Sequence, residues 1–434
     1  MGLQFTSSAQ ENSPYSRYGL GDLTPNQNIF TRGMGGISAA TNDNRSLNFT
    51  NPAALSQIGS TIFDLGGEID IRTLKSSSPA DKFTSTNTYF SYLQVGFPLT
   101  TPKMYKKDMS WGLSFGIKPV SKINYKIEKN ERIPNLDSLN TIYEGNGGVN
   151  QAFVGTGLRV KNFSIGLNAG YMFGSKDYST KLAFMNDTIY YYMSNSENKT
   201  TFGSFFFNGG MQYDIVLARD EKDARIIKRN LRIGLYGNLQ QNIRANSDNI
   251  RETIIYDQNG GFYRIDSVFE DKNVKGTIKY PARIGFGLNY QDRNWMFGVD
   301  FDYGNWGSYR YYGQTDAVKN NWTLRAGAQY YPNKGNSPTA KYFNFVKYRA
   351  GLYYGPDYIS VNKNRPEYGF TIGAGLPLTS LKKNYRLYDE FVILNTALEI
   401  GNRGNKQTNL RENLVRISIG LSMNASWFQK RKYY

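Results

Sequence analysis

The stretch Trp295-Met-Phe-Gly-Val-Asp-Phe-Asp-Tyr303 decides the fold of this chain. Every odd-numbered position carries a large apolar side chain, while the even-numbered positions carry Met, Gly and two Asp. A repeat of two places alternate side chains on opposite faces of a β-strand, so one face of this stretch is apolar and the other is not. An aromatic face opposite Gly and Asp is typical of a barrel wall with lipid outside and a polar lumen inside.

The same alternation recurs along the chain and predicts fourteen strands. It is clearest in the segments Tyr280–Tyr290, Trp322–Tyr330, Tyr368–Leu376 and Val415–Met423. No stretch approaches 18 consecutive apolar residues, so no transmembrane helix is predicted. The expected strands cover about 60–74, 86–98, 109–122, 148–160, 163–178, 200–217, 230–245, 276–290, 294–308, 318–331, 346–356, 367–377, 389–401 and 413–427.

The connections between these strands tend to alternate between long and short. Long connections are expected at 75–85, 123–147, 179–199 and 246–275, whereas Lys161-Asn162 and Gln291-Asp-Arg293 are tight turns. Bacterial barrels carry long loops on the outside and short turns at the periplasm. We therefore predict an all-β fold, a 14-stranded antiparallel transmembrane β-barrel over residues 59–428, in the outer membrane of a Gram-negative bacterium.

The two ends of the chain differ from the barrel. The stretch Leu3–Gln10 resembles the tail of a secretory signal, with Ser7 and Ala9 at the small-residue positions before the cleavage point, so residues 1–9 are interpreted as a residual signal-peptide tail. Residues 10–58 lack strand alternation but keep scattered Phe, Ile and Leu, which predicts a compact irregular segment. Residues 429–434 form a basic C-terminal tail.

Composition excludes several classes of function. The 434 residues include neither Cys nor His, which excludes disulfides, thiolate nucleophiles, His-ligated metals and Ser-His-Asp chemistry. We predict no enzyme activity, no catalytic residue, no metal and no cofactor. The formal net charge of +17 comes from scattered Lys and Arg without a basic helical face, so nucleic acid is not an expected partner. Outer-membrane lipid, lipopolysaccharide phosphates or an acidic partner account for the charge equally well.

A set of charged residues is expected to point into the lumen. Strands seven to eleven supply most of them, so a charged stripe on one wall is predicted. Because an unpaired charge in a confined lumen is costly, these groups should be paired or hydrated. One interpretation is a structural Arg–Asp network that holds the N-terminal segment, and the other is a selectivity lining or an anionic ligand site. The residues are Arg232, Arg283, Asp300, Asp302, Arg325, Arg349 and Arg416.

Two of these residues, Asp300 and Asp302, share a face two positions apart. Two carboxylates can perform acid–base chemistry. Because Arg283 and Arg325 lie on the neighbouring strands, ion pairing is the preferred interpretation.

Pro119 interrupts the third predicted strand, in the stretch Trp111–Val120. Proline removes a hydrogen-bond donor from the ladder and is disfavoured in mid-sheet. Either the residue marks a kink that opens a lateral gap in the wall, or the strand leaves the membrane just before it.

Two parts of the sequence resemble the FadL-type outer-membrane transport family of long-chain fatty acid and hydrophobic-compound transporters. The first is Arg32–Ala40 leading into Asn51-Pro-Ala-Ala-Leu55, and the second is Tyr280–Tyr290 with the following Trp295, Asp300 and Trp306. The resemblance implies that residues 10–58 are an N-terminal hatch, or plug, inside the barrel, with Asn51, Pro52 and Ala53 as the motif that ends it. It also implies passive uptake of a hydrophobic small molecule, with lateral exit beside a kinked third strand.

The C-terminal part points to an alternative role. The stretches Glu399–Gly404 and Met423–Tyr434 resemble a branch of FadL-like proteins that includes barrels serving as subunits of secretion or outer-membrane assembly machinery. The alternative function is therefore a non-transporting barrel that acts as a scaffold in a larger envelope complex, with other envelope proteins as partners. An outer-membrane enzyme is disfavoured because the absence of His removes the usual catalytic triad.

Overall fold

A computed structural model provides the structure of the protein. It describes residues 13–77, 80–133, 138–185, 189, 191–221, 227–256, 261–332, 341–361, 363–378, 391–404 and 410–425. The predicted signal tail (1–9) and basic C-terminal tail (429–434) lie outside the described residues.

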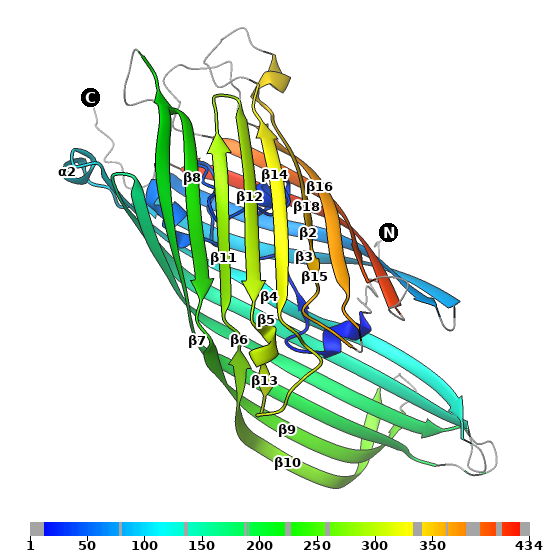
Figure 1. Cartoon of the computed structure of the whole chain (residues 1–434). Helices are drawn as coiled ribbons and strands as arrows, with labels where there is room; N and C mark the ends of the chain where they lie inside the picture. The colour runs from blue at the N-terminus through cyan, green and yellow to red at the C-terminus, as the bar shows by residue number, and fades with distance from the viewer. Residues whose placement is uncertain are drawn as a thin grey trace, which may run out of the picture.

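Antiparallel strands close into a single barrel (Figure 1), and the predicted 14-stranded barrel fold is confirmed. The strands β8 and β9 are two parts of one bent wall strand, as are β10 and β11, so sixteen segments make fourteen wall strands. β18 pairs with β2 over sixteen residues and closes the wall. The segments are β2 (Thr61–Ser77), β3 (Ala80–Pro98), β4 (Met109–Arg132), β5 (Ser138–Val160), β6 (Phe163–Phe184), β7 (Met193–Arg219), β8 (Ile227–Asn238), β9 (Gln241–Tyr256), β10 (Phe262–Tyr280), β11 (Arg283–Gln291), β12 (Trp295–Gly304), β14 (Asn321–Tyr330), β15 (Lys347–Pro356), β16 (Pro366–Pro377), β17 (Val392–Arg403) and β18 (Leu410–Ala425).

The sides of the wall follow the sequence alternation. On β12, Trp295, Phe297, Val299 and Phe301 are exposed on the outer surface, whereas the side chains between them are buried on the inner face. Equivalent apolar side chains on the neighbouring strands continue this band around the barrel. An outward band of aromatic and aliphatic side chains is what lipid contact requires.

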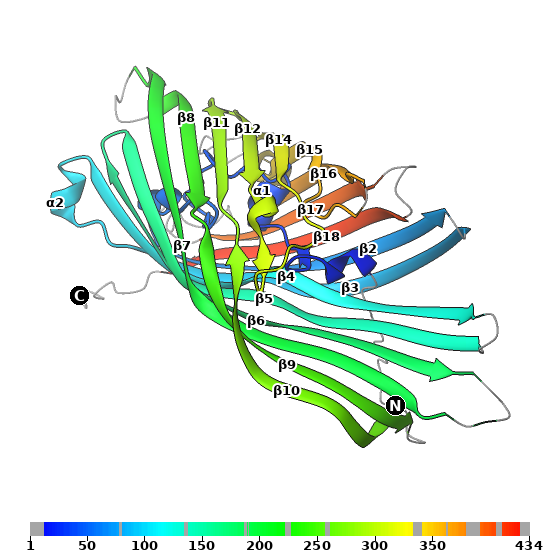
Figure 2. The same cartoon turned by 60° about the horizontal axis from the view of Figure 1, so that its bottom comes forward.

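The third to eighth wall strands are much longer than the sequence alternation predicts. β4 and β5 pair up to Arg132 and Ser138, with one register shift at Pro119–Ser121, so the loop predicted at 123–147 is a wrong assignment. The loops predicted at 75–85, 179–199 and 246–275 are wrong for the same reason. Beyond the lipid neither face has to be apolar, and polar cross-strand pairs carry the hydrogen-bonded ladder on without alternation. We call this part of β4, β5, β6, β7, β9 and β10 the extended sheet, and it projects from one end of the barrel (Figures 1 and 2).

The N-terminal segment, which we define as residues 13–60, lies inside the barrel (Figure 2). Most of its described side chains are buried, including Leu20, Ile29, Met34, Ile37 and Leu55. It contains short elements only: η1 (Pro14–Arg17), β1 (Asp22–Leu23), α1 (Ile29–Arg32) and η2 (Pro52–Gln57). The other short elements are α2 (Pro102–Tyr105), η3 (Trp306–Ser308), β13 (Arg310–Tyr311) and η4 (Tyr342–Phe345). Within the described ranges, no helix has the length and apolar character needed to cross a membrane.

Candidate functional site in the barrel lumen

The Asn51-Pro52-Ala53 motif joins the N-terminal segment to the wall. The side-chain oxygen of Asn51 accepts a hydrogen bond of 3.1 Å from the Ala53 amide, which caps η2, and Pro52 occupies the first position of this helical turn. The side-chain amide of Asn51 donates to the Ala39 carbonyl (2.6 Å) and to two wall carbonyls, those of Met211 and Leu235 (3.3 Å each). One fully buried side chain thus holds two parts of the segment and two wall strands.

Glycines on the inner face let the segment contact the wall backbone directly. A Cβ at Gly166 would lie 2.4 Å from the amide nitrogen of Ala53, and one at Gly351 would lie 2.2 Å from the amide nitrogen of Gly35. Any larger side chain at these positions would displace the segment. The alternating Gly residues of the sequence therefore serve close packing of the lumen.

The structure brings Arg283, Asp302 and Arg325 together on β11, β12 and β14. Arg283 donates to both carboxylate oxygens of Asp302 at 2.7 and 2.8 Å, and Arg325 lies 3.9 Å from the same carboxylate. The Tyr236 hydroxyl also donates to Asp302. Asp300 differs from the expectation, because it forms no ion pair within the described residues and accepts the backbone amides of Ser38 and Ala39, the latter at 2.7 Å.

The remaining predicted charges have separate partners. Arg232 donates to Asp214 at 2.7 Å, and Arg416 donates to Asp70 at 2.7 Å and to Glu399 at 3.1 Å. Arg349 is held by the amide oxygens of Gln329 (2.9 Å) and Asn395 (2.8 Å), and its guanidinium lies 4.5 Å from the ring centroid of Phe30. A guanidinium over an aromatic face is attracted by the ring quadrupole.

Several buried charges were missed from the sequence. Arg32 of α1 pairs with Glu68 of β2, so the N-terminal segment contributes a charge of its own. Asp22 of β1 pairs with Arg72 and Arg403 at 2.5 and 2.6 Å. Arg365 pairs with Asp357 (2.9 Å) and Glu412 (3.1 Å). The spacing of Glu68, Asp70 and Arg72, at every second residue of the first strand, was a signal for part of this set. Charge is therefore distributed around the wall, not confined to the expected stripe.

Asp43 ties the N-terminal segment to β15 through a salt bridge of 2.5 Å to the Lys347 ammonium. Burial acts to raise the pKa of Asp43, but the charge of Lys347 and the hydrogen bond from its ammonium outweigh burial and lower the pKa to about 2. A carboxyl group with a lowered pKa stabilises the fold above its unfolded pKa, and this contribution is lost as the pH falls through about 2.

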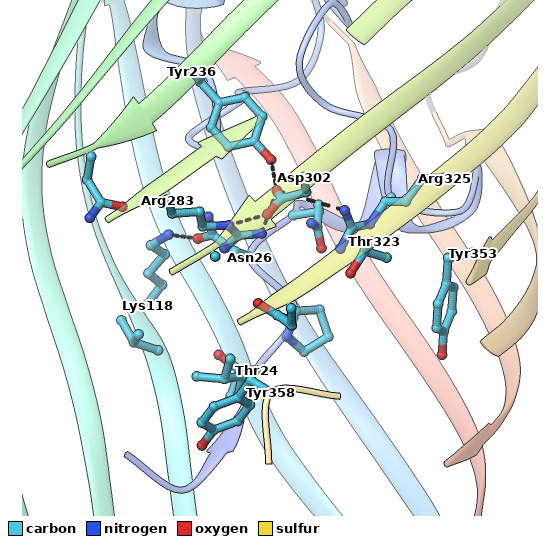
Figure 3. A pocket seen from close by; sticks show the side chains of 18 of the residues that line it. Thr24, Asn26, Lys118, Tyr236, Arg283, Asp302, Thr323, Arg325, Tyr353 and Tyr358 are labelled. Carbon is cyan, nitrogen blue, oxygen red and sulfur yellow. Dashed lines mark hydrogen bonds and ion pairs between the residues drawn. The ribbon is translucent and has the colours of Figure 1, made fainter. Parts of the chain in front are cut away.

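The space left between the N-terminal segment and the wall is small, with charged side chains on part of its lining and aromatic side chains such as Phe49, Phe153 and Trp306 on the rest. A cavity of about 200 Å³ is lined by Lys118, Arg283, Asp302, Arg325 and Arg416 together with several hydroxyl groups. Figure 3 shows Asp302 between Tyr236, Arg283 and Arg325, and Lys118 beside Asn26. Pockets for organic ligands usually measure about 300–1,000 Å³ and are mostly apolar. Arg232, Asp300 and Arg349 do not line this cavity.

Pro119 lies inside β4, which continues to Arg132. The register against β5 shifts between Pro119 and Ser121, which marks a β-bulge. Pairing of β3 with β4 covers only Leu93–Pro98 and Gly112–Ile117 and stops two residues before the proline. A depression of about 680 Å³ that includes Pro119 lies beside this point.

No cluster of three or more acidic, His or Cys side chains suitable for a metal ion occurs in the part of the chain that the structure describes. The acidic groups of the described lumen bind arginine, lysine, hydroxyl groups or backbone amides.

Comparison with solved structures identifies relatives of the same fold. The chain is similar to a Pseudomonas aeruginosa FadL homologue, with 14% identity, a TM-score of 0.55 and coverage of 94% of this chain and 99% of the other. It is also similar to the Ralstonia pickettii toluene transporter TbuX, with 14% identity, a TM-score of 0.54 and coverage of 92% of this chain and 98% of the other. A third similar structure is the Pseudomonas putida toluene transporter TodX, with 13% identity, a TM-score of 0.53 and coverage of 94% of this chain and 100% of the other. The resemblance to FadL-type barrels is confirmed at the level of the fold. A comparison with curated proteins finds no match. A family model described as BamG matches residues 1–434.

Proposed function

The chain belongs to the BamG family, and from this premise we propose that it is a non-transporting barrel that acts as a subunit of a larger complex in the outer membrane of a Gram-negative bacterium. Residues 10–58 are its hatch, which stays in place as part of the fold. Its partners are other proteins of the envelope, and membrane lipid with lipopolysaccharide surrounds the outward band.

The observation that supports this proposal is the closed lumen. The hatch contacts the wall through backbone atoms at Gly166 and Gly351 and through buried ion pairs such as Arg32–Glu68. Breaking a buried ion pair costs roughly 3–5 kcal/mol because one charge is left without its partner. Removing the hatch during transport would break several such pairs at once, so a fixed hatch is the more stable arrangement.

The cavity that remains supports the same proposal. Its volume of about 200 Å³ is below the range usual for organic ligands, and an apolar ligand would dehydrate the arginine and carboxylate groups on part of its lining without compensation. The relatives named as toluene transporters share the barrel, but identity of 13–14% leaves the lumen free to differ.

Affinity purification of the full-length protein from its native membrane in mild detergent tests the proposal. We expect defined envelope proteins to be recovered in fixed ratio to the barrel, and to remain bound after a salt wash that removes non-specific contacts. Recovery of the barrel alone, from membranes in which it is correctly folded, would contradict the proposal.

Passive uptake of a hydrophobic small molecule is the second candidate function. It is favoured by the fold shared with hydrocarbon channels and by the end of β3–β4 pairing beside Pro119, where a lateral route could begin. Mass spectrometry of the purified protein should then detect a bound hydrophobic compound. Replacement of Pro119 by Ala should reduce uptake if that route is used.

A further inference from the structure

Two turns of the wall lie side by side at the end of the barrel opposite the extended sheet. Residues 99–108 connect β3 with β4 and contain α2, and residues 161–162 connect β5 with β6. The Lys161 amide donates to the Asp108 carbonyl at 2.8 Å, which joins the two turns. Figure 1 shows α2 at the end of the barrel that lies away from β9 and β10. Because the short turns of bacterial barrels face the periplasm, we assign the two turns to the periplasmic side.

Three lysines share one face of the α2 turn. The Thr101 hydroxyl caps the turn and Pro102 occupies its first position, which fixes the local backbone. The Lys106 amide donates to the Pro102 carbonyl at 3.2 Å, so the helical turn continues past α2. Residues three and four apart lie on the same side of a helical turn, which places Lys103 beside Lys106 and Lys107. Like charges in this arrangement repel one another and disfavour the turn.

The positive charge of this surface has no acidic partner within the fold. We call Lys103, Lys106, Lys107 and Lys161 the basic face. All four side chains are exposed, and none of them forms an ion pair with an acidic side chain in the described ranges. Asp108 is the one acidic residue in the sequence of the two turns. Four positive charges beside one negative charge favour an anion from outside the chain.

The basic face borders an aromatic part of the apolar band. Trp111, Phe163 and Tyr213 are exposed on β4, β6 and β7, and Phe163 and Tyr213 are cross-strand partners. The side chain of Tyr105 in α2 is also 72% exposed. Aromatic side chains at the edge of an apolar band lie at the level of the lipid headgroups, and nearby lysines extend their ammonium groups toward the same layer. The basic face therefore lies at the height of the headgroups of the periplasmic leaflet.

We propose that the basic face binds anionic phospholipids of the periplasmic leaflet, whose phosphate groups lie against its four ammonium groups. An ammonium group is a compact point charge and imposes no fixed geometry on a phosphate, so negative charge is recognised and not one particular headgroup. Bound phosphate also offsets the repulsion among the three lysines of the α2 turn. The inference concerns the membrane around the barrel and is independent of the protein partners of the proposed function.

A variant that lacks three charges of the basic face tests the proposal against a control of equal net charge. The test variant combines Lys103→Gln, Lys106→Gln and Lys107→Gln. The control variant replaces three exposed lysines at the other end of the barrel, and it combines Lys82→Gln, Lys199→Gln and Lys363→Gln. Correct folding of both variants is checked by the difference in gel mobility between heated and unheated samples.

Native mass spectrometry then measures the lipids bound to the full-length protein in a neutral detergent. The protein is mixed with equal amounts of phosphatidylglycerol and phosphatidylcholine that carry the same acyl chains. We expect the wild type and the control variant to retain at least about fivefold more phosphatidylglycerol at about 0.1 M salt, and the test variant to retain the two lipids within about twofold of each other. The wild-type preference should also fall to within about twofold at about 1 M salt, where the screening length is only about 3 Å.

Three results would overturn the inference. The first is equal retention of the two lipids by the wild type, and the second is an unchanged preference in the test variant. The third is an equal loss of preference in the control variant, because the total charge of the protein would then explain the binding. If lipid preference is absent and purification from native membranes recovers an acidic protein with the wild type but not with the test variant, the basic face is a protein contact and the inference also fails.

Discussion

Asp302 contacts three side chains from three different strands of the lumen. Its carboxylate accepts from Arg283 and Tyr236 and lies near Arg325, so one acidic group balances two guanidinium groups from neighbouring strands. The sequence placed these residues on the inner face because β-strand alternation is local. It could not assign Asp300 to the Ser38 and Ala39 amides, because that contact depends on how the N-terminal segment folds.

Asp302→Asn should destabilise the barrel by roughly 1.5–3 kcal/mol, because the partly buried Arg283 loses the charge that its hydrogen bonds compensate. Unfolding in urea, followed by tryptophan fluorescence, measures the change. Glu270→Gln is the control, since it removes an acid from an exposed ion pair with Lys272 and should leave the midpoint unchanged. Equal midpoints for wild type and Asp302→Asn would show that the lumenal pair contributes nothing.

Asn51 should be sensitive to the loss of its donor group. Asn51→Ala removes the cap of η2 and the bonds to three carbonyls, which should cost about 1–3 kcal/mol. Asn51→Asp keeps the acceptor for the Ala53 amide but places a carboxylate against those carbonyls, so it should be the more harmful change. Limited proteolysis of the N-terminal segment in the folded barrel provides the measurement. Greater protection in the Asp variant than in the Ala variant would contradict the assigned hydrogen bonds.

At the scale of elements, each wall strand consists of a lipid-facing part and, from β4 to β10, an extension. The sequence predicted the lipid-facing parts within a few residues, because a strand with one apolar and one polar face has an apolar side chain at every second position of its sequence. The extensions were assigned to loops, because a strand with polar residues on both faces shows no apolar repeat in its sequence. The pairing of such a strand is determined by its partner strand. Cross-strand partners such as Asp214 for Arg232 depend on register, which the alternation of a single strand does not determine.

A charge introduced on the outer surface should distinguish the two parts. Val299→Arg on β12 should destabilise the barrel by about 2–4 kcal/mol, because the guanidinium would face hydrocarbon. Ser194→Arg, at an exposed position on the extension of β7, should have no measurable effect. Refolding yield into lipid vesicles and unfolding in urea test both variants. A similar loss of stability in the Val299→Arg and Ser194→Arg variants would mean that lipid also surrounds the extended sheet.

At the scale of the whole molecule, the barrel and its N-terminal segment form one packed unit. Backbone contacts at the wall glycines and charge pairs on several strands hold the segment, and the space that remains is a cavity of about 200 Å³. The outline of the fold is that of hydrophobic-compound channels. The interior is filled by apolar clusters, such as that of Ile29, Phe49 and Phe153, together with paired charges. In this arrangement the outer surface and the extended sheet are the parts available to other molecules.

Deleting residues 13–58 should convert a closed barrel into a conducting pore, since the described wall strands pair with one another independently of the segment. Single-channel recording in planar bilayers measures this, with heat-dependent gel mobility as the check that the shortened barrel is folded. The full-length protein should show no such conductance. A folded but non-conducting deletion variant would contradict the assignment of the segment as the closure.

The entry of a fluorescent hydrophobic compound into liposomes that contain the purified full-length protein tests the central claim most directly. The account predicts a rate equal to that of protein-free liposomes, because the lumen is closed by paired charges and packed backbone. A saturable rate that increases with the amount of protein in the membrane would contradict it and would identify the chain as a transporter.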